Sequence, residues 1–386
     1  MNYIVAHFKR FDGVVFFAPL ALAGLGLLSI YSNLSRAGDF SAFWRQAAFL
    51  GIGIAAMLAA SFFDWRIFKE NSAAVLMFYA ASIIALAGLF FFGSSVRGVR
   101  TWYDLGIFTL DPIELLKPAL LALLAKYFSR RHETMYQIRH LALTGLYAAL
   151  PAALIFFQPN LGPCLVIIPL WIGLLLMAGA KKTHLLFLLA GFLALFVLGW
   201  LFLFKDYQKD RIADFFAPQD PLGVSWSQNQ ARIAVGTGGI LGKGFGQGSQ
   251  AQYGFLSEPR TDFIFAAIIE EFGLLAGAAA LFLLFIIIWR LTRAARRARD
   301  NFSKFFLAGL AMLLFAEAAV HIGVNIGFLP IIGLPLPLVS YGGSNLISTL
   351  AMLGVAQGMI SGRGILPSEN KRRANPPLPG GNFCAF

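Results

Sequence analysis

An aspartate stands at the point where a polar stretch of the chain gives way to a long apolar run. Asp262 ends the hexapeptide Ser257-Glu-Pro-Arg-Thr-Asp and is followed at once by Phe-Ile-Phe. Water still reaches a side chain at such a boundary, which suits a general base that takes a proton from a hydroxyl group. An aspartate directly before an apolar helix is also a favoured N-cap, because its carboxylate accepts backbone N–H bonds. The two roles are compatible, and both remain open.

A carboxylate and an amine lie three residues apart within another apolar run. Glu114 and Lys117 share one face of a helix at this spacing. Charged side chains persist in an apolar helix when they pair with each other, line a cavity or serve the function. Arg97 and Arg100 precede the run, and two guanidinium groups beside an ammonium group suit a pyrophosphate. The pattern indicates a structural ion pair with basic groups facing lipid, or an anion site.

A polar stripe runs along a third apolar segment. Glu317, His321 and Asn325 recur every four residues and therefore lie on one helix face. Such a stripe either makes hydrogen bonds to neighbouring helices or forms the wall of a polar cavity. Both interpretations place the three side chains inside a helix bundle.

Metal chemistry has little support in the sequence. The chain of 386 residues has two cysteines and five histidines, and all of them are scattered. Thiolate zinc sites and disulfide frameworks need more cysteines at closer spacing. No set of ligands demands a metal ion, so the involvement of one stays unknown.

The composition shows which elements must position these residues. Apolar residues make up 58% of the chain and charged residues only 13%, about half the roughly 25% expected of a soluble domain. Because about 20 apolar residues span a bilayer, we predict an all-α polytopic membrane protein with about ten transmembrane helices. Nine or eleven spans stay open, because the fourth run is short and only a proline-rich turn separates the ninth from the tenth. The predicted spans are 13–32, 43–63, 73–93, 112–128, 139–157, 161–179, 184–204, 262–290, 305–329 and 338–360.

The basic side chains predict the orientation of these spans. With ten spans, 20 of the 31 Lys and Arg residues fall on the side that holds both chain ends, so the positive-inside rule places both termini in the cytoplasm. Topology thus accounts for most of the net charge of +12, and no nucleic-acid partner is expected. We expect residues 1–362 to form one membrane domain. Residues 363–386, which are basic and proline-rich, are expected to form a disordered cytoplasmic tail.

One loop outside the membrane is long enough to carry function. We expect residues 205–261 to form it, with an amphipathic helix on the membrane surface near 225–235. Its glycine run, 236–248, lacks the spacing of a phosphate-binding P-loop. The glycines indicate either tight turns or a close approach of the backbone to a ligand.

Four ordered blocks of residues give the chain a family resemblance. They are Arg100–Gly106 with Asp111–Lys117, Gln158–Gly162, Glu258–Phe265 with Glu270–Gly273, and His321–Gly327 with Gly333–Ser344. With these blocks the chain resembles, over nearly its whole length, the SEDS family (shape, elongation, division and sporulation), which includes RodA, FtsW and SpoVE. Overall likeness and short terminal extensions favour the RodA branch.

The resemblance implies a peptidoglycan glycosyltransferase of the bacterial cytoplasmic membrane. Such an enzyme polymerises lipid II at the outer face, for elongation or division, and works with a class B penicillin-binding protein. The resemblance makes Asp262 the essential aspartate, and Glu114 and Lys117 the Glu-x-x-Lys pair of the family. Asn160 departs from the pattern, because many members have aspartate there, and the lost charge argues against an acidic or cation-binding role for this position.

We therefore expect an inverting transfer in which Asp262 takes the proton of the acceptor hydroxyl while undecaprenyl pyrophosphate leaves the donor. Basic side chains would stabilise the leaving pyrophosphate, and a divalent cation such as Mg or Mn could share that role. The expected substrate-binding residues are Glu114, Lys117, Arg100, Arg232, Lys243 and Arg260. The expected cavity-lining residues are Asn160, Glu317, His321, Asn325, Ser340 and Tyr341.

Two alternatives come from other classes of protein. A lipid II flippase or transporter would need a polar path through both leaflets, whereas most of the candidate residues cluster toward one face. Glu317 is the residue that fits polymerisation least. A non-catalytic scaffold of the cell-wall machinery would reduce Asp262 to a helix cap, and Asp262→Asn would then be tolerated.

Overall fold

The structure is a computed structural model of the whole chain. It describes residues 11–362 apart from 37, 97–98, 105, 107–108, 133–136, 159, 203 and, except for 209 and 213, 205–225. The expected tail, 363–386, and the first part of the expected loop therefore lie outside the described residues.

The described residues form ten long helices, one for each of the ten predicted spans, and the all-α prediction is confirmed. Their bounds are α2 Gly13–Leu34, α3 Ser41–Phe62, α5 Ser72–Phe92, α6 Pro112–Arg131, α7 Ile138–Phe157, α8 Leu161–Met177, α9 Lys182–Phe202, α13 Ile264–Arg297, α14 Asn301–Asn325 and α15 Gly343–Ser361. Six of them, α2, α3, α5, α7, α13 and α14, are long and apolar enough to cross a membrane. The protein is therefore a multi-pass membrane protein.

Several of these helices begin at a polar side chain that accepts backbone N–H bonds. Asp12 caps α2 through Val14 N at 3.1 Å, and Asn71 caps α5 through Ala73 N at 2.9 Å. Asp111 caps α6 through Ile113 N at 2.9 Å and is followed by Pro112, which suits the first turn. Each of these N-caps sets the residue at which its helix begins.

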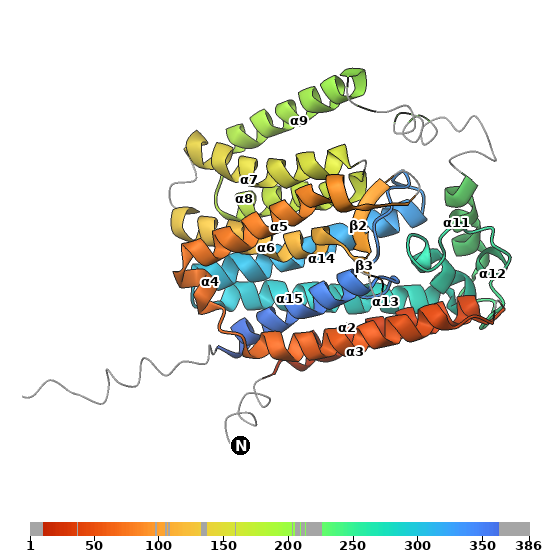
Figure 1. The fold of residues 1–386 in the computed structure, drawn as a ribbon. Helices are drawn as coiled ribbons and strands as arrows, with labels where there is room; N and C mark the ends of the chain where they lie inside the picture. Colours follow the sequence, from red (N-terminus) through yellow and green to blue (C-terminus); the bar gives the residue numbers. More distant parts are fainter. Residues whose placement is uncertain are drawn as a thin grey trace, which may run out of the picture.

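Short elements lie at both ends of the helix bundle. The helices α11 (Trp226–Thr237) and α12 (Ser249–Gln252) and a small antiparallel sheet, β1 (Ser94–Val96), β2 (Val99–Asp104) and β3 (Thr109–Leu110), lie at one end, which we call the loop end. The helix α4 (Arg66–Glu70) lies at the opposite end (Figure 1). Helix α11 is the helix predicted near 225–235, and its place on the membrane surface stays a prediction; the sheet was not predicted.

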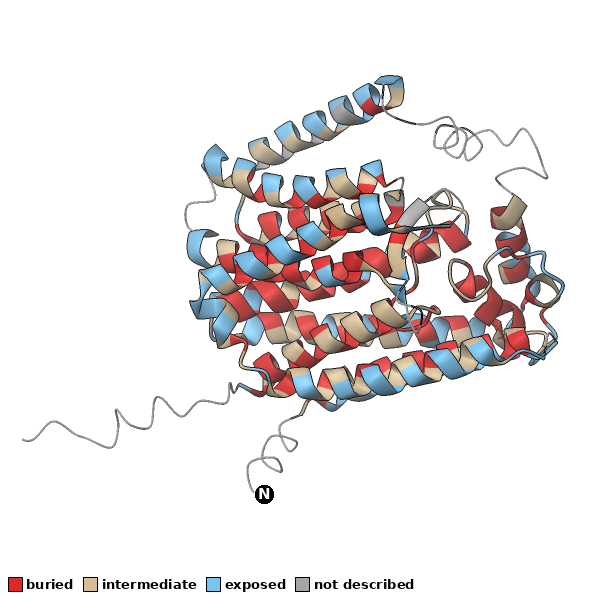
Figure 2. Ribbon diagram, viewed as in Figure 1, coloured by how far each residue is buried: buried red, intermediate tan, exposed pale blue. Residues whose placement is uncertain are grey.

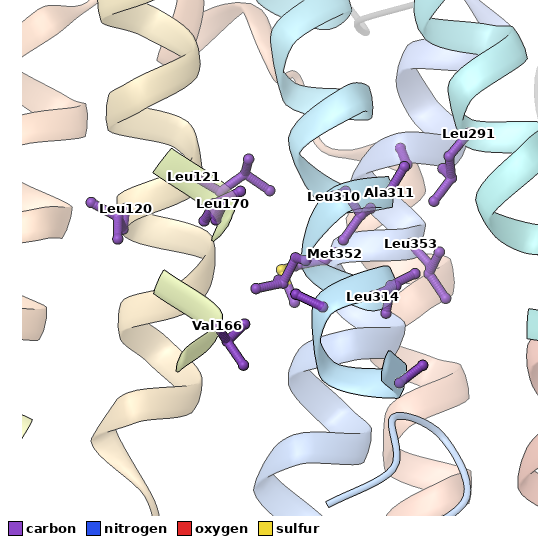
Figure 3. Close-up of a cluster of buried hydrophobic side chains, with 14 of the residues drawn as sticks. Leu120, Leu121, Val166, Leu170, Leu291, Leu310, Ala311, Leu314, Met352 and Leu353 are labelled. Atoms are coloured by element: carbon purple, nitrogen blue, oxygen red, sulfur yellow. The ribbon is translucent and has the colours of Figure 1, made fainter. Parts of the chain in front are cut away.

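The core places α14 in the interior of the bundle. Figure 2 shows exposed residues along the outer faces of α3 and α9 and buried residues between the helices. In Figure 3, apolar side chains of α14 meet those of α6, α8, α13 and α15; the labelled ones are Leu120, Leu121, Val166, Leu170, Leu291, Leu310, Ala311, Leu314, Met352 and Leu353. Polar side chains of α14 are consequently held inside the protein.

Candidate active site

The segment from Glu258 to Phe263, at the loop end, is fixed by contacts to α14 and to the loop that follows it. Asn325 of α14 donates from Nδ2 to the Asp262 carbonyl at 2.9 Å. Ser340 Oγ donates to the Thr261 carbonyl at 2.7 Å, and the Tyr341 amide donates to the Arg260 carbonyl at 2.9 Å. The backbone around Asp262 is thus held by side chains and amides that are distant in sequence.

Asp262 itself lies one position before the N-cap of α13. The N-cap residue is Phe263, whose side chain makes no cap bond. The amide of Ala266 in the first turn donates instead to Asn325 Oδ1 at 3.0 Å. The carboxylate of the half-buried Asp262 lies beside Gly333, where an added Cβ would be 3.7 Å from Asp262 Oδ2.

The polar stripe of α14 bonds to neighbouring helices, as one of the two interpretations expected: the Ala266 amide of α13 donates to Asn325 Oδ1 at 3.0 Å, and Glu317 pairs with Lys117 of α6 at 2.6 Å. Asn325 Nδ2 also donates to the His321 carbonyl at 2.8 Å, and His321 Nδ1 lies 2.8 Å from the Leu334 carbonyl. All three stripe residues are buried. Two of them, His321 and Asn325, fix the loops that surround Asp262.

The loop after α14 is fixed by hydrogen bonds to a glutamine of α3. Gln46 donates from Nε2 to the Ser340 carbonyl at 3.2 Å and accepts from the Gly342 amide at 3.1 Å. Ser340 Oγ also accepts from the Leu336 amide at 2.8 Å, while it donates to the carbonyl of Thr261. Ser340 and Tyr341 therefore position the Asp262 segment through this loop.

Lys117 lies between two carboxylates in the interior of the bundle. Its Nζ is 2.7 Å from Glu114 Oε1 and 2.6 Å from Glu317 Oε1. Asn345 of α15 donates to the same Glu114 oxygen at 3.2 Å. The Lys117 side chain is only 5% exposed, so its positive charge interacts with these two carboxylates inside the protein. The predicted pair of Glu114 and Lys117 is present, and Glu317 is a third member that spacing did not reveal.

The backbone of the glycine run packs against α13. Lys243 Nζ is 2.7 Å from the fully buried Glu270 Oε1, and its amide donates to the Glu270 carbonyl at 2.9 Å. The first turn of α12 donates to the same carboxylate, through Gln250 N at 3.0 Å. Gly242 has φ +82, and a Cβ there would collide with the backbone of α13 near Glu271. These glycines let one backbone approach another backbone.

The remaining candidates are spread around this end of the molecule. Arg232 is exposed on α11, and its side chain lies against Gly327, just beyond the end of α14. Arg260 is half-buried beside Asp262. Arg100 lies in β2, and its side chain is outside the described part, as is the whole of Arg97.

Asn160 lies at the start of α8, close to the same group of loops. It occupies the N-cap position without a side-chain cap bond. Two residues later, a Cβ at Gly162 would lie 3.2 Å from the Ile332 carbonyl and 3.4 Å from the Gly333 carbonyl. Since Gly333 also adjoins Asp262, three of the four motif blocks meet here.

An apolar groove with a volume of about 380 Å³ runs between α3, α5, α6 and α15. Its polar part is lined by Thr109, Asp111, Glu114, Ser344 and Ser348, and its other walls are mostly aromatic and aliphatic. Such a groove, with polar groups at the loop end, suits a molecule with a polar head and a long apolar tail. Within the described residues, no group of three or more His, Cys, Asp or Glu side chains is placed to hold a metal ion.

The fold and the clustered motif blocks define a class of multi-pass membrane proteins with a built site at one end of the bundle. The chain belongs to the cell cycle protein family of FtsW, RodA and SpoVE, whose model matches residues 14–361. Stage V sporulation protein E of Bacillus subtilis is 33% identical over 355 residues, which cover 89% of this chain and 95% of that protein. The peptidoglycan glycosyltransferase MrdB of Escherichia coli K12 is 33% identical over 366 residues, covering 93% and 97%.

Solved structures agree with this assignment. A chain from a study of the structural coordination of polymerization and crosslinking by a peptidoglycan synthase complex matches with a TM-score of 0.77 at 29% identity. The match covers 91% of this chain and 97% of that one. The rod shape determining protein RodA of Thermus thermophilus matches with a TM-score of 0.68 at 28% identity, covering 91% and 96%.

Proposed function

We propose that this protein is a peptidoglycan glycosyltransferase that polymerises lipid II. The observation that carries the proposal is the construction of the Asp262 segment, whose backbone is held by Asn325, Ser340 and Tyr341 at the loop end. A catalytic carboxylate must be held in one geometry, because misplacement by about 1 Å can cost about 10²-fold in rate. Two curated relatives named as peptidoglycan glycosyltransferases, MrdB and FtsW, support the same activity.

In the proposed reaction, the C4 hydroxyl of the acceptor N-acetylglucosamine attacks C1 of the donor N-acetylmuramic acid. The bond from C1 to the pyrophosphate oxygen breaks, and undecaprenyl pyrophosphate leaves with inversion at C1. Asp262 takes the proton of the attacking hydroxyl as general base, a role worth about 10²–10⁴-fold in rate. No redox partner is required.

We assign the stabilisation of the leaving pyrophosphate to arginines rather than to Lys117 or Lys243. Both lysines are paired with buried glutamates, at 2.6–2.7 Å, and are positioning residues in this proposal. Arg260 and Arg232 lie at the loop end, and Arg100 is in the strand that leads toward α6. Guanidinium groups bind phosphate oxygens in pairs. A divalent cation, Mg or Mn, stays a prediction for the same role.

The apolar groove between α3, α5, α6 and α15 is our candidate for a polyprenyl tail. Its volume of about 380 Å³ is within the range of ligand pockets, and its polar lining residues are on the same side as the loop end. One lipid-linked substrate would then place its tail in the groove and its sugar near Asp262.

We place the loop end at the outer face of the cytoplasmic membrane and both termini in the cytoplasm. The opposite end of the bundle holds the basic ends of α6 and α13, including Arg130, Arg131, Arg296 and Arg297, which the positive-inside rule assigns to the cytoplasm. A class B penicillin-binding protein is the proposed partner, because the complex of the structural relative couples polymerization to crosslinking.

A flippase is the alternative, and Glu317 is the residue that fits polymerisation least. Glu317 pairs with Lys117, which also pairs with Glu114, so the burial of Glu317 is accounted for without a transport path. The test is to reconstitute the purified protein in vesicles with lipid II and to follow glycan chains and lipid II translocation together. Glycan chains without faster translocation are expected, and translocation without glycan chains would contradict the proposal.

A further inference from the structure

The tip of the glycine run, residues 239–242, pairs with the kink of α13. Gly273 has φ 83 and ψ 174, which interrupts the helix. Just after this kink, the amide of Leu274 donates to the Gly239 carbonyl at 2.9 Å and that of Leu275 to the Ile240 carbonyl at 3.2 Å. The depth of the tip in the membrane is therefore the depth of Leu274 and Leu275.

The distance along α13 from its basic end to Leu275 gives that depth. Arg290 of α13 pairs with Asp12, the cap of α2, and is followed by Arg293, Arg296 and Arg297, which marks the membrane boundary at this end. Leu275 precedes Arg290 by 15 residues (290 − 275), or about 22 Å along the helix at 1.5 Å per residue. The hydrocarbon core is about 30 Å thick. Leu275 and the paired tip thus lie about 8 Å inside the far boundary.

Helix α2 gives a second measure from the same boundary, because Asp12 pairs with Arg290. Ser32 is 20 residues beyond Asp12 (32 − 12), or about 30 Å along the helix, and its Oγ accepts from the Gly246 amide at 2.8 Å. Gly246 therefore lies at the boundary, while residues 239–242 lie deeper. The glycine run descends into the membrane and returns.

The tip has the surface that lipid would require. Ile240 is 67% exposed and Leu241 is 78% exposed, and residues 239–242 carry no charge. Their exposed surface continues that of α13, where Leu274, Leu275 and Phe282 are also exposed. Irregular backbone is tolerated at membrane depth only where protein satisfies its polar groups. Here two of the four tip carbonyls, those of Gly239 and Ile240, accept from amides of α13, and the two amides that follow the tip, those of Lys243 and Gly244, donate to carbonyls of α13.

We propose that residues 239–242 form a re-entrant tip whose Ile240 and Leu241 side chains contact the acyl chains of the leaflet at the loop end. The occupant of this surface is phospholipid. The ion pair of Lys243 with the buried Glu270, together with the kink at Gly273, holds the tip at that depth. Gly242 allows the close approach to α13, and Gly239 supplies a positive φ of +60 in the turn.

The test is a depth measurement by spin labelling. Single-cysteine variants Leu241→Cys, Phe285→Cys and Asp39→Cys are made in a Cys164→Ala, Cys384→Ser background. The full chain is placed in nanodiscs of phosphatidylethanolamine and phosphatidylglycerol, without any partner. Collision rates of the nitroxide with oxygen, which concentrates in lipid, and with a water-soluble nickel chelate are compared. Phe285, 62% exposed on α13, is the lipid control, and Asp39, in the loop between α2 and α3, is the water control.

The proposal predicts an oxygen-to-nickel ratio at position 241 close to that at 285 and several-fold above that at 39. A ratio equal to that at 39 would place the tip in water and overturn the proposal. Protection of position 241 from both reagents would also overturn it, because protein would then cover the tip. Ile240→Cys repeats the measurement where Leu241→Cys does not fold. No outcome depends on glycosyltransferase activity.

Discussion

Lys117 forms ion pairs with carboxylates on two helices. Glu114 lies on its own helix, α6, and Glu317 lies on α14. Burial of one ammonium with two carboxylates leaves little tolerance for removal of the cation. Each carboxylate would lose its attraction while it stays out of water. The same triad explains why charged residues persist in a segment that spans the membrane.

We predict that Lys117→Met lowers the free energy of unfolding by about 3–5 kcal/mol. The matched control is Lys69→Met, because Lys69 pairs with Asp300 at 3.8 Å with its side chain 43% exposed, and such surface pairs contribute about 0–1 kcal/mol. Thermal unfolding in detergent measures both. Equal losses of stability in the two variants would contradict the role of the buried triad.

Asn325 is the residue that connects α14 to the Asp262 segment. Its side chain makes three hydrogen bonds, to the carbonyls of Asp262 and His321 and from the amide of Ala266. We predict that Asn325→Ala lowers glycosyltransferase activity by about 10²-fold, because the backbone at Asp262 is released. Asn301→Ala, at the exposed start of α14, should keep full activity in the same assay of glycan chain formation. Full activity of Asn325→Ala would remove this positioning role.

At the scale of elements, the ten helices were predictable because the bilayer fixes the length of an apolar run. The observed bounds differ by a few residues from the predicted spans, and caps such as Asp12 and Asp111 account for the starts of α2 and α6. The sheet formed by β1, β2 and β3 was not predicted. Its strands have three, six and two residues, and such short strands depend on tertiary contacts, such as the bond from Tyr103 Oη to the Ala85 carbonyl of α5 at 2.6 Å.

The glycine run shows what spacing alone leaves open. Its composition allowed tight turns or a close approach to a ligand, and the structure shows a close approach to α13. We predict that Gly242→Ala destabilises this docking, because Gly242 has φ +82 and its Cβ would enter the backbone of α13. Gly236→Ala is the control, since a Cβ there meets nothing within 4 Å. Limited proteolysis should cut the segment 236–253 faster in Gly242→Ala alone, and equal rates would contradict the prediction.

For the whole molecule, the sequence could name candidate residues for the chemistry, but it could predict only part of how they meet. Glu114 and Lys117 were paired correctly because one helix joins them. Glu317 is 200 residues beyond Lys117 (317 − 117), and only the packing of α14 against α6 brings the two together. The pairing of Lys243 with Glu270 likewise depends on the kink at Gly273, which no local pattern indicates.

The proposed orientation of the chain in the membrane can be tested by chemical labelling. With the loop end outside and both termini in the cytoplasm, a membrane-impermeant maleimide should label Asp39→Cys in intact spheroplasts. The native Cys384 should be labelled only after permeabilisation, because the predicted ten-span topology assigns 20 of the 31 basic residues to its side. Labelling of Cys384 in intact spheroplasts would contradict the proposed topology.

In the proposed reaction, Asp262 is the general base of a lipid II polymerase. The most direct measurement is glycan chain formation by the purified protein with its penicillin-binding partner, comparing wild type, Asp262→Asn and the control Asp39→Asn, each checked for its unfolding temperature. We predict glycan chains from wild type and Asp39→Asn, and a loss of at least about 10²-fold in folded Asp262→Asn. Glycan chains formed by Asp262→Asn at the wild-type rate would contradict the role of Asp262 as general base.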